Sequence, residues 1–483
     1  MGANGRAEHH SPSSAKTSPR GGAGGGVEHY SPSTKSPRAF SVASLLPSGA
    51  AAWLFDSRWA VSAAVTVFLF IAATLTVTST SSSLSPVSAS FFSFFPSSGS
   101  VDLAEPPVAN VSSSAPPPPP PPGADVPRLA YLVSGSKGDL DRLWRTLHAL
   151  YHPRNLYVVH LDREAPVGER LELARRVANS TVFRRVGNVE VIRRANMVTY
   201  RGPTMVANTL HACAVLLRRS RDWDWFINLS ASDYPLMTQD DILHAFSTLP
   251  RNVNFVEHTG NLGWKEGQRA KPLIVDPGLY SSQKQDIFYA GKARREMPTA
   301  FKLFTGSAWV GLSRDFAEYV VWGWDNLPRT LLMYYSNFVS SPEGYFQTVL
   351  CNAPRFVPTV ANHDLHHIQW DTPPRQHPHA LNLADMDRMV RSNAPFARKF
   401  ARDDPVLDVI DGALLRGRGK NGTAAGMFAP GGWCGEGGDC VGHVAAVGGR
   451  DDWVLWPGPG AERLQRLMHR VVRSEAFPNS QCK

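Results

Sequence analysis

Short apolar runs alternate with amphipathic stretches between Arg128 and Ala231, and this alternation limits the fold of the chain more than any other feature. Each apolar run has the length of a buried strand, and a helix-like repeat of apolar residues separates one run from the next. The predicted strands are LAYLVSG (129–135), LYVVHLD (156–162), VEVIR (189–193) and WFINLSA (225–231). Strands that alternate with helices in this way predict an α/β fold built on a parallel sheet.

The segments between these strands carry helix signals of their own. Asp139 is placed to cap a helix over 140–150, a second helical stretch lies near 169–177, and a third runs from the Gly-Pro pair at 202 to about residue 219. Ligands of open α/β sheets bind beyond the carboxyl ends of the strands. We therefore expect ligand contacts in the turns that follow the predicted strands.

Residues 59–77, WAVSAAVTVFLFIAATLTV, contain no charge and are long enough to cross a bilayer as a helix. Six Lys or Arg residues precede this segment, and none occurs between Ser79 and Pro127. This asymmetry predicts that the N-terminus stays in the cytosol and that the rest of the chain lies across the membrane. Because 58 residues come before the segment, we expect a single-pass signal anchor and not a cleaved signal peptide.

The composition on either side of this segment differs from that of a folded domain. Residues 1–58 are rich in Gly, Ser and Pro, which predicts a disordered cytoplasmic tail. Residues 78–126 are rich in Ser and contain seven consecutive prolines at 116–122, which favour an extended polyproline II stem. We expect one lumenal domain over 127–483, held away from a membrane by this stem.

Charge and cysteine content narrow the class of protein further. The formal net charge is +9 with the basic residues spread along the chain, which argues against a nucleic-acid-binding protein and suits an anionic ligand. Five cysteines are too few for a disulfide scaffold. Cys213 and Cys351 fall on apolar helix faces and are expected to be core thiols. Cys434 and Cys440 lie in a Gly-rich loop where an oxidising lumen would allow a short disulfide.

The stretch SSPEGYFQTVL (340–350) has two interpretations. Ser341 at a cap, Pro342 at the first helical position and Glu343 in the first turn are typical of a helix start. On the local pattern alone, Glu343 is a carboxylate that stabilises a helix dipole. Whether it is also a reactive group depends on the motifs elsewhere in the chain.

Four long motifs occur in a fixed order: LAYLVSGSKGDLDRLWRTLHALYHPRNLYVVHLDREA, WFINLSASDYPLMT, FTGSAWVGLSRDFAEYV and SSPEGYFQTVL. From about Arg128 to Asp411 the chain resembles the core-2/I-branching glycosyltransferase family, which includes peptide O-xylosyltransferases. GGWCGEGGDC and WPGPGAERLQRLM are similar to its plant branch, the arabinogalactan β-glucuronosyltransferases. The resemblance implies a GT-A-type fold, a UDP-sugar donor and inversion at the anomeric carbon.

The resemblance also implies roles for single residues. Glu343 matches the carboxylate that takes the proton from the acceptor hydroxyl. The GSxW motif of the xylosyltransferases has an Asp that serves at the acceptor, and Ala308 stands there in this chain, which weakens the xylosyl option. Lys399 and Arg375 match basic side chains that offset the charge of the leaving diphosphate in place of a metal.

Further contacts follow from the same resemblance. The donor side comprises Val133, Asp162, Tyr200 and Asp233, and the acceptor side comprises Glu257, Lys265, Arg269 and Trp370. A Trp face packs on a sugar ring, and a carboxylate accepts hydrogen bonds from hydroxyl groups. Arg193, Arg194 and Arg201 are candidates for binding a donor carboxylate.

Two segments contain residue types that are common in metal sites. Asp222-Trp223-Asp224 has the Asp-x-Asp pattern that many GT-A enzymes use for a divalent metal, but it precedes its strand and therefore lies at the wrong end of the sheet. The histidines of 362–379 follow no ligand spacing, and the prolines among them predict a loop. We expect no cofactor and metal-independent transfer, with Mn²⁺ as the alternative.

These observations combine into a functional hypothesis. The chain is predicted to be a type II Golgi membrane enzyme that transfers glucuronic acid from UDP-glucuronate to galactose residues of arabinogalactan, with no nucleic-acid partner. Transfer of N-acetylglucosamine or xylose by the same fold is one alternative. A catalytically inactive lumenal carbohydrate-binding scaffold is the other.

Overall fold

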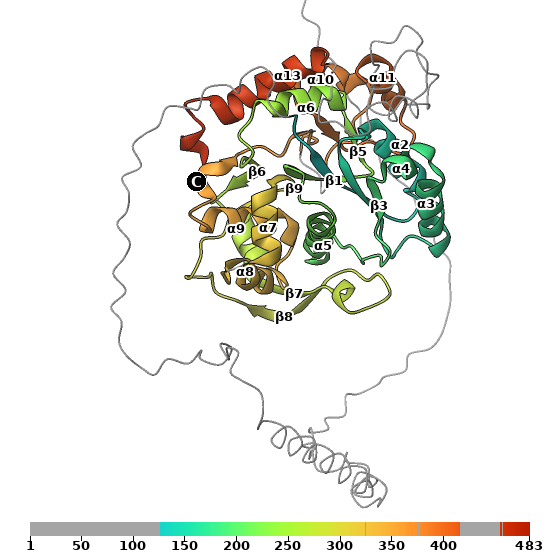
Figure 1. Cartoon of the computed structure of the whole chain (residues 1–483). Coiled ribbons are helices and arrows are strands. Elements are labelled where there is room, and N and C mark those ends of the chain that lie inside the picture. Colours follow the sequence, from blue (N-terminus) through green and yellow to red (C-terminus); the bar gives the residue numbers. More distant parts are fainter. Residues whose placement is uncertain (1–125, 324, 374–376, 416–454, 456) are drawn as a thin grey trace, which may run out of the picture. The chain divides into compact units, whose positions relative to one another are not determined.

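A computed structural model describes residues 126–483 except 324, 374–376, 416–454 and 456. Its centre is a seven-stranded sheet in the order β10-β6-β9-β4-β1-β2-β3 (Figure 1). The strands are β1 (Leu129–Gly135), β2 (Leu156–Leu161), β3 (Val189–Val191), β4 (Trp225–Ser230), β6 (Asn254–Thr259), β9 (Thr305–Ser313) and β10 (Val360–Ala361).

The four predicted strands are confirmed, and they pair in parallel as expected. β1 lies between β2 and β4, and β3 extends the sheet beyond β2. The whole sheet is mixed, because β9, which the sequence did not reveal, is antiparallel to both β4 and β6. This strand enters from the opposite end, and no local pattern in the sequence reports the direction in which a distant strand joins a sheet.

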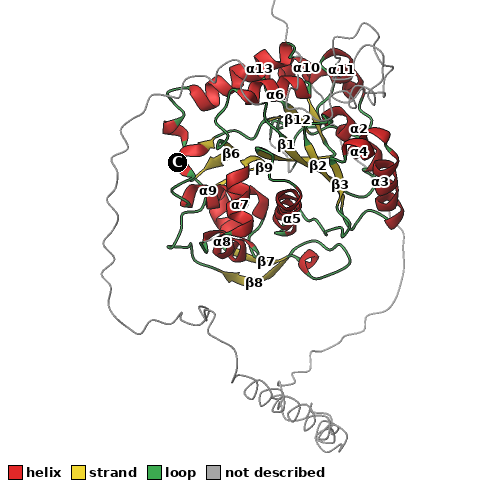
Figure 2. Ribbon diagram, in the orientation of Figure 1, coloured by secondary structure: helices red, strands yellow, loops and turns green. Residues whose placement is uncertain are grey.

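Helices cover both faces of this sheet (Figure 2). The alternation along β1 divides its side chains, since Leu129, Tyr131 and Val133 pack into one core and Ala130 and Leu132 into the other. The first core is completed by α2 (Leu140–Leu150), α3 (Val167–Asn179), α4 (Thr181–Val186), α6 (Gln239–Ser247) and α13 (Pro459–Met468). The second is completed by α5 (Thr204–Arg219), α7 (Arg314–Trp322), α8 (Leu327–Tyr335) and α9 (Tyr345–Asn352).

Two small sheets flank the ends of the central strands. One joins β5 (Asp233–Pro235), β11 (His366–Ile368) and β12 (Phe396–Arg398), and the other is the pair β7 (Pro272–Val275) and β8 (Phe288–Arg294). Helices α10 (Met386–Ser392) and α11 (Pro405–Ala413) follow later in the chain, and short turns of helix cover Glu266–Ala270, Pro277–Leu279, Ser341–Glu343, Val357–Thr359, Leu383–Asp385, His469–Arg473 and Pro478–Ser480.

The predictions for the cysteines have different outcomes. Cys213 is a buried free thiol, as predicted. The prediction for Cys351 is wrong, because it forms a disulfide with Cys482, at a sequence separation of 131. Cys434 and Cys440 lie outside the described residues.

The membrane segment predicted at 59–77 also lies outside the described residues. Among the helices that the structure does describe, none combines the length and the apolar character that a bilayer crossing requires.

Asn228 shows how β4 and β9 are joined where their ladder ends. Its side-chain amide donates to the Ala308 carbonyl at 3.0 Å, and its side-chain oxygen accepts from the Val310 amide at 2.8 Å. The residue is 2% exposed. Asn228, the asparagine of an Asn-Leu-Ser sequon, is therefore a buried structural residue.

Gly306 explains part of the FTGSAWVG motif in structural terms. It pairs with His258 at the bulge between β9 and β6, and a Cβ at this position would overlap the Glu257 carbonyl. Because that carbonyl is backbone, we expect Gly306→Ala to lower the free energy of unfolding by about 1–3 kcal/mol. Gly168→Ala is the matched control, since a Cβ there meets nothing within 4 Å. Urea unfolding of both variants measures the difference, and equal stabilities would contradict the close approach.

Candidate active site

Glu343 projects from a single turn of 3-10 helix, Ser341–Glu343, that comes before α9. The predicted helix start is wrong in detail, because α9 begins at Tyr345 with Gly344 at its cap and without a side-chain cap bond. The Ser341 hydroxyl instead donates to the carbonyls of Tyr335 and Phe338, at 2.7 and 2.8 Å. The Glu343 carboxylate is therefore not engaged in capping and is directed elsewhere.

The carboxylate of Glu343 meets one phenol and two cations. Its Oε1 accepts a hydrogen bond from the Tyr200 hydroxyl at 3.0 Å. Its Oε2 is paired with Arg269 and lies 3.7 Å from the Lys265 ammonium. The side chain is only 15% exposed. The carboxylate therefore lies between a hydroxyl donor and two cationic side chains.

The pKa values of Tyr200 and Lys265, two neighbours of Glu343, are shifted from their ordinary values. Tyr200 is 45% exposed, but desolvation of its hydroxyl, followed by the adjacent Glu343 carboxylate, raises the pKa of Tyr200 above its ordinary value, so that the hydroxyl stays protonated and donates. Burial lowers the pKa of Lys265, while Glu343 opposes that change. The Lys265 ammonium also donates to the Thr305 hydroxyl at 3.1 Å, which fixes it beside β9.

The remaining acceptor-side candidates differ in position. Desolvation and the Asp364 carboxylate raise the pKa of Glu257, and the Lys265 charge opposes them, so Glu257 belongs to the same charged group. Trp370 is half exposed. Among the described residues, no hydrogen bond, ion pair or ring contact joins it to Glu343. Trp264, which the sequence reasoning missed, stacks on the Arg269 guanidinium at 5.0 Å and is 60% exposed. Its position directly before Lys265 was the available signal.

Asp162 lies at the carboxyl end of β2, as predicted, and is buried. Its Oδ1 accepts from the Ser136 hydroxyl and from the Glu164 amide, both at 3.0 Å. Burial raises the pKa of Asp162, while the Lys284 ammonium, 4.0 Å from Oδ2, opposes the rise. Lys284 is a second residue that the sequence did not reveal. It reaches Asp162 and Glu164 from the connection between β7 and β8.

Two of the predicted donor contacts are buried. The Val133 side chain is fully buried in the core. The Asp233 carboxylate is also buried, where it pairs with Arg398 at 3.0 Å and accepts from the Ser230 amide at 2.7 Å. Arg398 in turn stacks on Trp309 at 3.9 Å. Both donor contacts stay predictions.

The basic residues predicted at the diphosphate are only partly described. Lys399 directly follows β12, next to Arg398, and is partly buried. Burial and the neighbouring Arg398 charge lower the pKa of Lys399. Arg375 lies outside the described residues. Arg201 pairs with Asp286 at 3.3 Å, beside Tyr200.

Asp222 and Asp224 are confirmed as a structural turn at the far end of β4. Asp222 binds the Arg128 guanidinium and Asp224 accepts from the Arg128 amide, each at 2.8 Å.

Among the described residues, the His, Cys, Asp or Glu group that is close enough to share an ion consists of His258, Cys351 and Cys482, and its two sulfurs are joined in the disulfide.

A hollow of about 460 Å³ lies beside the loop that carries Lys265. It is lined by Gly260, Asn261, Leu262, Gly263, Glu266, Met297, Pro298, Phe301, Lys302 and Leu303. Its wall therefore combines polar and apolar groups, and Glu266 in this wall directly follows Lys265 in the sequence.

The arrangement agrees with comparisons to known proteins. The sequence model of the Core-2/I-Branching enzyme family matches residues 129–390. The chain belongs to this family. The matched range contains Glu343, Lys265 and Arg269, so the family resemblance seen in the sequence is confirmed, together with a mixed α/β fold of the glycosyltransferase-like kind.

Several members of the Core-2/I-Branching family are similar to this chain. The Arabidopsis thaliana β-glucuronosyltransferase GlcAT14A is 62% identical over 357 residues, which cover 74% of this chain and 78% of that protein. GlcAT14C from the same plant is 50% identical over 358 residues, or 74% and 86% of the two chains. Xylosyltransferase 1 of Homo sapiens is 28% identical over 251 residues, or 51% and 24% of the two chains.

Proposed function

We propose that this protein is an inverting β-glucuronosyltransferase that moves glucuronic acid from UDP-glucuronate to galactose residues of arabinogalactan. The observation that carries the proposal is the largely buried carboxylate of Glu343, which contacts the Tyr200 hydroxyl, the Arg269 guanidinium and the Lys265 ammonium. The high identity to proteins named β-glucuronosyltransferases supports the choice of sugar. The GT-A-type class of the fold is part of the same proposal.

The reaction assigns one task to each group. The acceptor hydroxyl oxygen bonds to the anomeric carbon as the bond from that carbon to UDP breaks, and Glu343 takes the hydroxyl proton. Attack from the side opposite the leaving group inverts the configuration. Lys399 offsets the charge that develops on the diphosphate, and Asp162 contacts the nucleoside.

UDP-glucuronate, the proposed donor, carries a sugar carboxylate in addition to its diphosphate. Arg201, next to Tyr200, is the most suitably placed of the three candidate arginines for the glucuronate carboxylate, since it lies one residue from a Glu343 contact. Arg193 and Arg194 are exposed residues between β3 and α5. A guanidinium binds a carboxylate in a two-point geometry that neutral hexoses cannot use.

Two other readings compete with this one. Transfer of xylose is disfavoured because Ala308, buried in β9, supplies no carboxylate at the GSAW motif. An inactive carbohydrate-binding scaffold has no need for a largely buried carboxylate that is contacted by two cations and a phenol. The Golgi location, the type II topology and the anchor at 59–77 complete the proposal on the strength of the charge pattern described above.

A donor screen tests the proposal. Full-length protein in mild detergent is incubated with UDP-glucuronate, UDP-xylose or UDP-N-acetylglucosamine and a galactan oligosaccharide, and UDP release is measured. We expect turnover with UDP-glucuronate, a β-linked product by NMR, and retention of activity in EDTA. Turnover with another donor alone would replace the proposed sugar. Loss of activity in EDTA that Mn²⁺ restores would overturn metal-independent transfer.

A further inference from the structure

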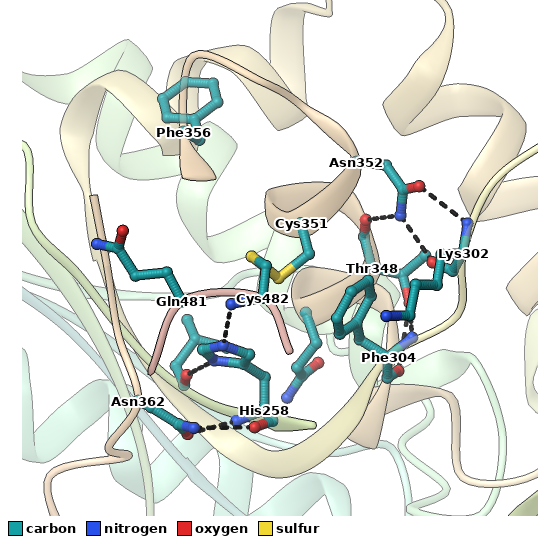
Figure 3. Close-up of a disulfide and its surroundings, with 12 residues drawn as sticks. His258, Lys302, Phe304, Thr348, Cys351, Asn352, Phe356, Asn362, Gln481 and Cys482 are labelled. Carbon is teal, nitrogen blue, oxygen red and sulfur yellow. Dashed lines mark hydrogen bonds between the residues drawn. A yellow bond between two sulfur atoms is a disulfide. The ribbon is translucent and has the colours of Figure 1, made fainter. Parts of the chain in front are cut away.

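The segment Gln481–Lys483 is joined to two elements that border the candidate active site (Figure 3). Cys482 forms the disulfide with Cys351 in α9, and its amide donates to His258 Nε2 at 2.8 Å. The Lys483 carbonyl accepts from the Gly260 amide at 2.5 Å, and the Gln481 side chain donates to the Pro358 carbonyl at 2.9 Å. The segment is therefore bonded covalently to α9 and hydrogen-bonded to the end of β6.

His258 is a fixed partner in this connection. Its Nδ1 lies 2.8 Å from the Val256 carbonyl, which can only accept, so Nδ1 carries the proton and Nε2 is left as an acceptor for the Cys482 amide. The His258 backbone is held on both sides by Asn362, with bonds of 2.8 and 3.0 Å. The ring is buried.

The two connected elements carry opposite halves of the site. On the β6 side, Glu257 precedes His258, and the loop after Gly260 leads to Lys265 and Arg269. On the α9 side, the helix begins two residues after Glu343. The pairing of Glu343 with Arg269 and Lys265 therefore depends on how the end of β6 lies relative to α9.

A side chain of α9 also contacts the backbone of β9 and β6 directly. The Gln347 side chain of α9 donates to the Ser307 carbonyl of β9 at 2.5 Å, and it lies 3.4 Å from the Glu257 carbonyl. This bond holds α9 near the end of β6, while the loop after Gly260 is held farther on by the Lys265–Thr305 bond at 3.1 Å and by the Arg269–Glu343 pair. The segment 481–483 supplies the restraint at Gly260 itself.

We propose that the segment 481–483, locked by the Cys351–Cys482 disulfide, is a positioning element that holds the acceptor-side cations against Glu343. The inference rests on the proposed function of that site. None of the three residues has to touch substrate. They act by limiting the motion of the loop that carries Lys265 and Arg269, so thiol reduction weakens use of the acceptor while the donor side, at Asp162 and Lys399, is left unchanged.

The test uses the full-length protein with both cysteines replaced, Cys351→Ser/Cys482→Ser, and with Cys213→Ala as the matched control. We expect the acceptor kcat/KM of the double variant to fall roughly tenfold, mainly through KM, because displacement of a site by about 1 Å is costly. The donor KM should change by less than about twofold, since only the acceptor half moves. A purely stabilising disulfide would lower the active fraction without changing the acceptor KM, and that result would overturn the proposal.

Reduction of the folded wild-type protein gives a second measurement in case the double variant does not fold. A phosphine reductant should raise the acceptor KM of the wild-type protein and of Cys213→Ala alike. An unchanged acceptor KM after complete reduction of the folded protein would count against the positioning role.

Amide hydrogen exchange separates this inference from the proposed function. We expect faster exchange at 257–270 in the double variant, with exchange at 129–162 unchanged. Absence of transfer by the wild-type protein with every donor would reject the proposed function alone, and the exchange result would still decide whether the segment positions the loop. Equal exchange in variant and wild type would refute that role.

Discussion

Glu343→Gln is expected to lower kcat for glucuronosyl transfer by about 10²–10⁴-fold, because the amide cannot take the proton from the acceptor hydroxyl. This corresponds to a loss of roughly 3–5 kcal/mol of transition-state stabilisation. The change keeps the size of the side chain and an oxygen that accepts from Tyr200. UDP affinity, measured by calorimetry, should remain near that of the wild type, since the proposed mechanism places Glu343 at the acceptor hydroxyl.

The control for Glu343→Gln is Glu318→Gln on α7, which removes an exposed carboxylate paired with Arg314 at 2.6 Å. Its kcat should match the wild type because an exposed ion pair within a helix contributes little. Collapse of folding in Glu343→Gln would show that the carboxylate is mainly structural. The structure argues against that outcome, since α9 has no side-chain cap bond and the Glu343 oxygens bind Tyr200 and Arg269.

Lys399→Ala is expected to lower kcat by about 10²–10³-fold, the usual effect of removing one preorganised group that stabilises developing charge. The ammonium would lie where the diphosphate leaves, and its loss should also weaken UDP binding. Lys399→Arg should recover part of the rate because it retains the positive charge. Steady-state kinetics and calorimetry with UDP measure both effects.

Lys271→Ala is the matched control for Lys399→Ala, since Lys271 forms a surface pair with Glu266 at 2.7 Å. We expect it to keep the wild-type kcat and UDP affinity. If Lys399→Ala behaved like this control, another group would have to offset the diphosphate charge, and the metal-independent proposal would lose its main residue. Recovery of the kcat of Lys399→Ala on addition of Mn²⁺ would also count against metal-independent transfer.

The strands and helices between 129 and 231 were predictable because each depends on side-chain periodicity within a few residues. The direction of β9 was not, since strand direction is set by how a distant segment returns to the sheet. Asp233 illustrates the same limit at the level of one residue. Its place after a strand predicts a ligand contact, but no local pattern indicated that Arg398, which is remote in the sequence, pairs with it in a buried ion pair.

The sequence by itself determined the family, the strand–helix alternation and Glu343 as the candidate base, because ordered motifs and local periodicity are written along the chain. Only the tertiary structure decided what surrounds Glu343. Arg269 is 74 positions away and Tyr200 is 143 positions away, and both reach the carboxylate. Contacts at such separations arise from packing around the sheet, and a local pattern carries no record of them.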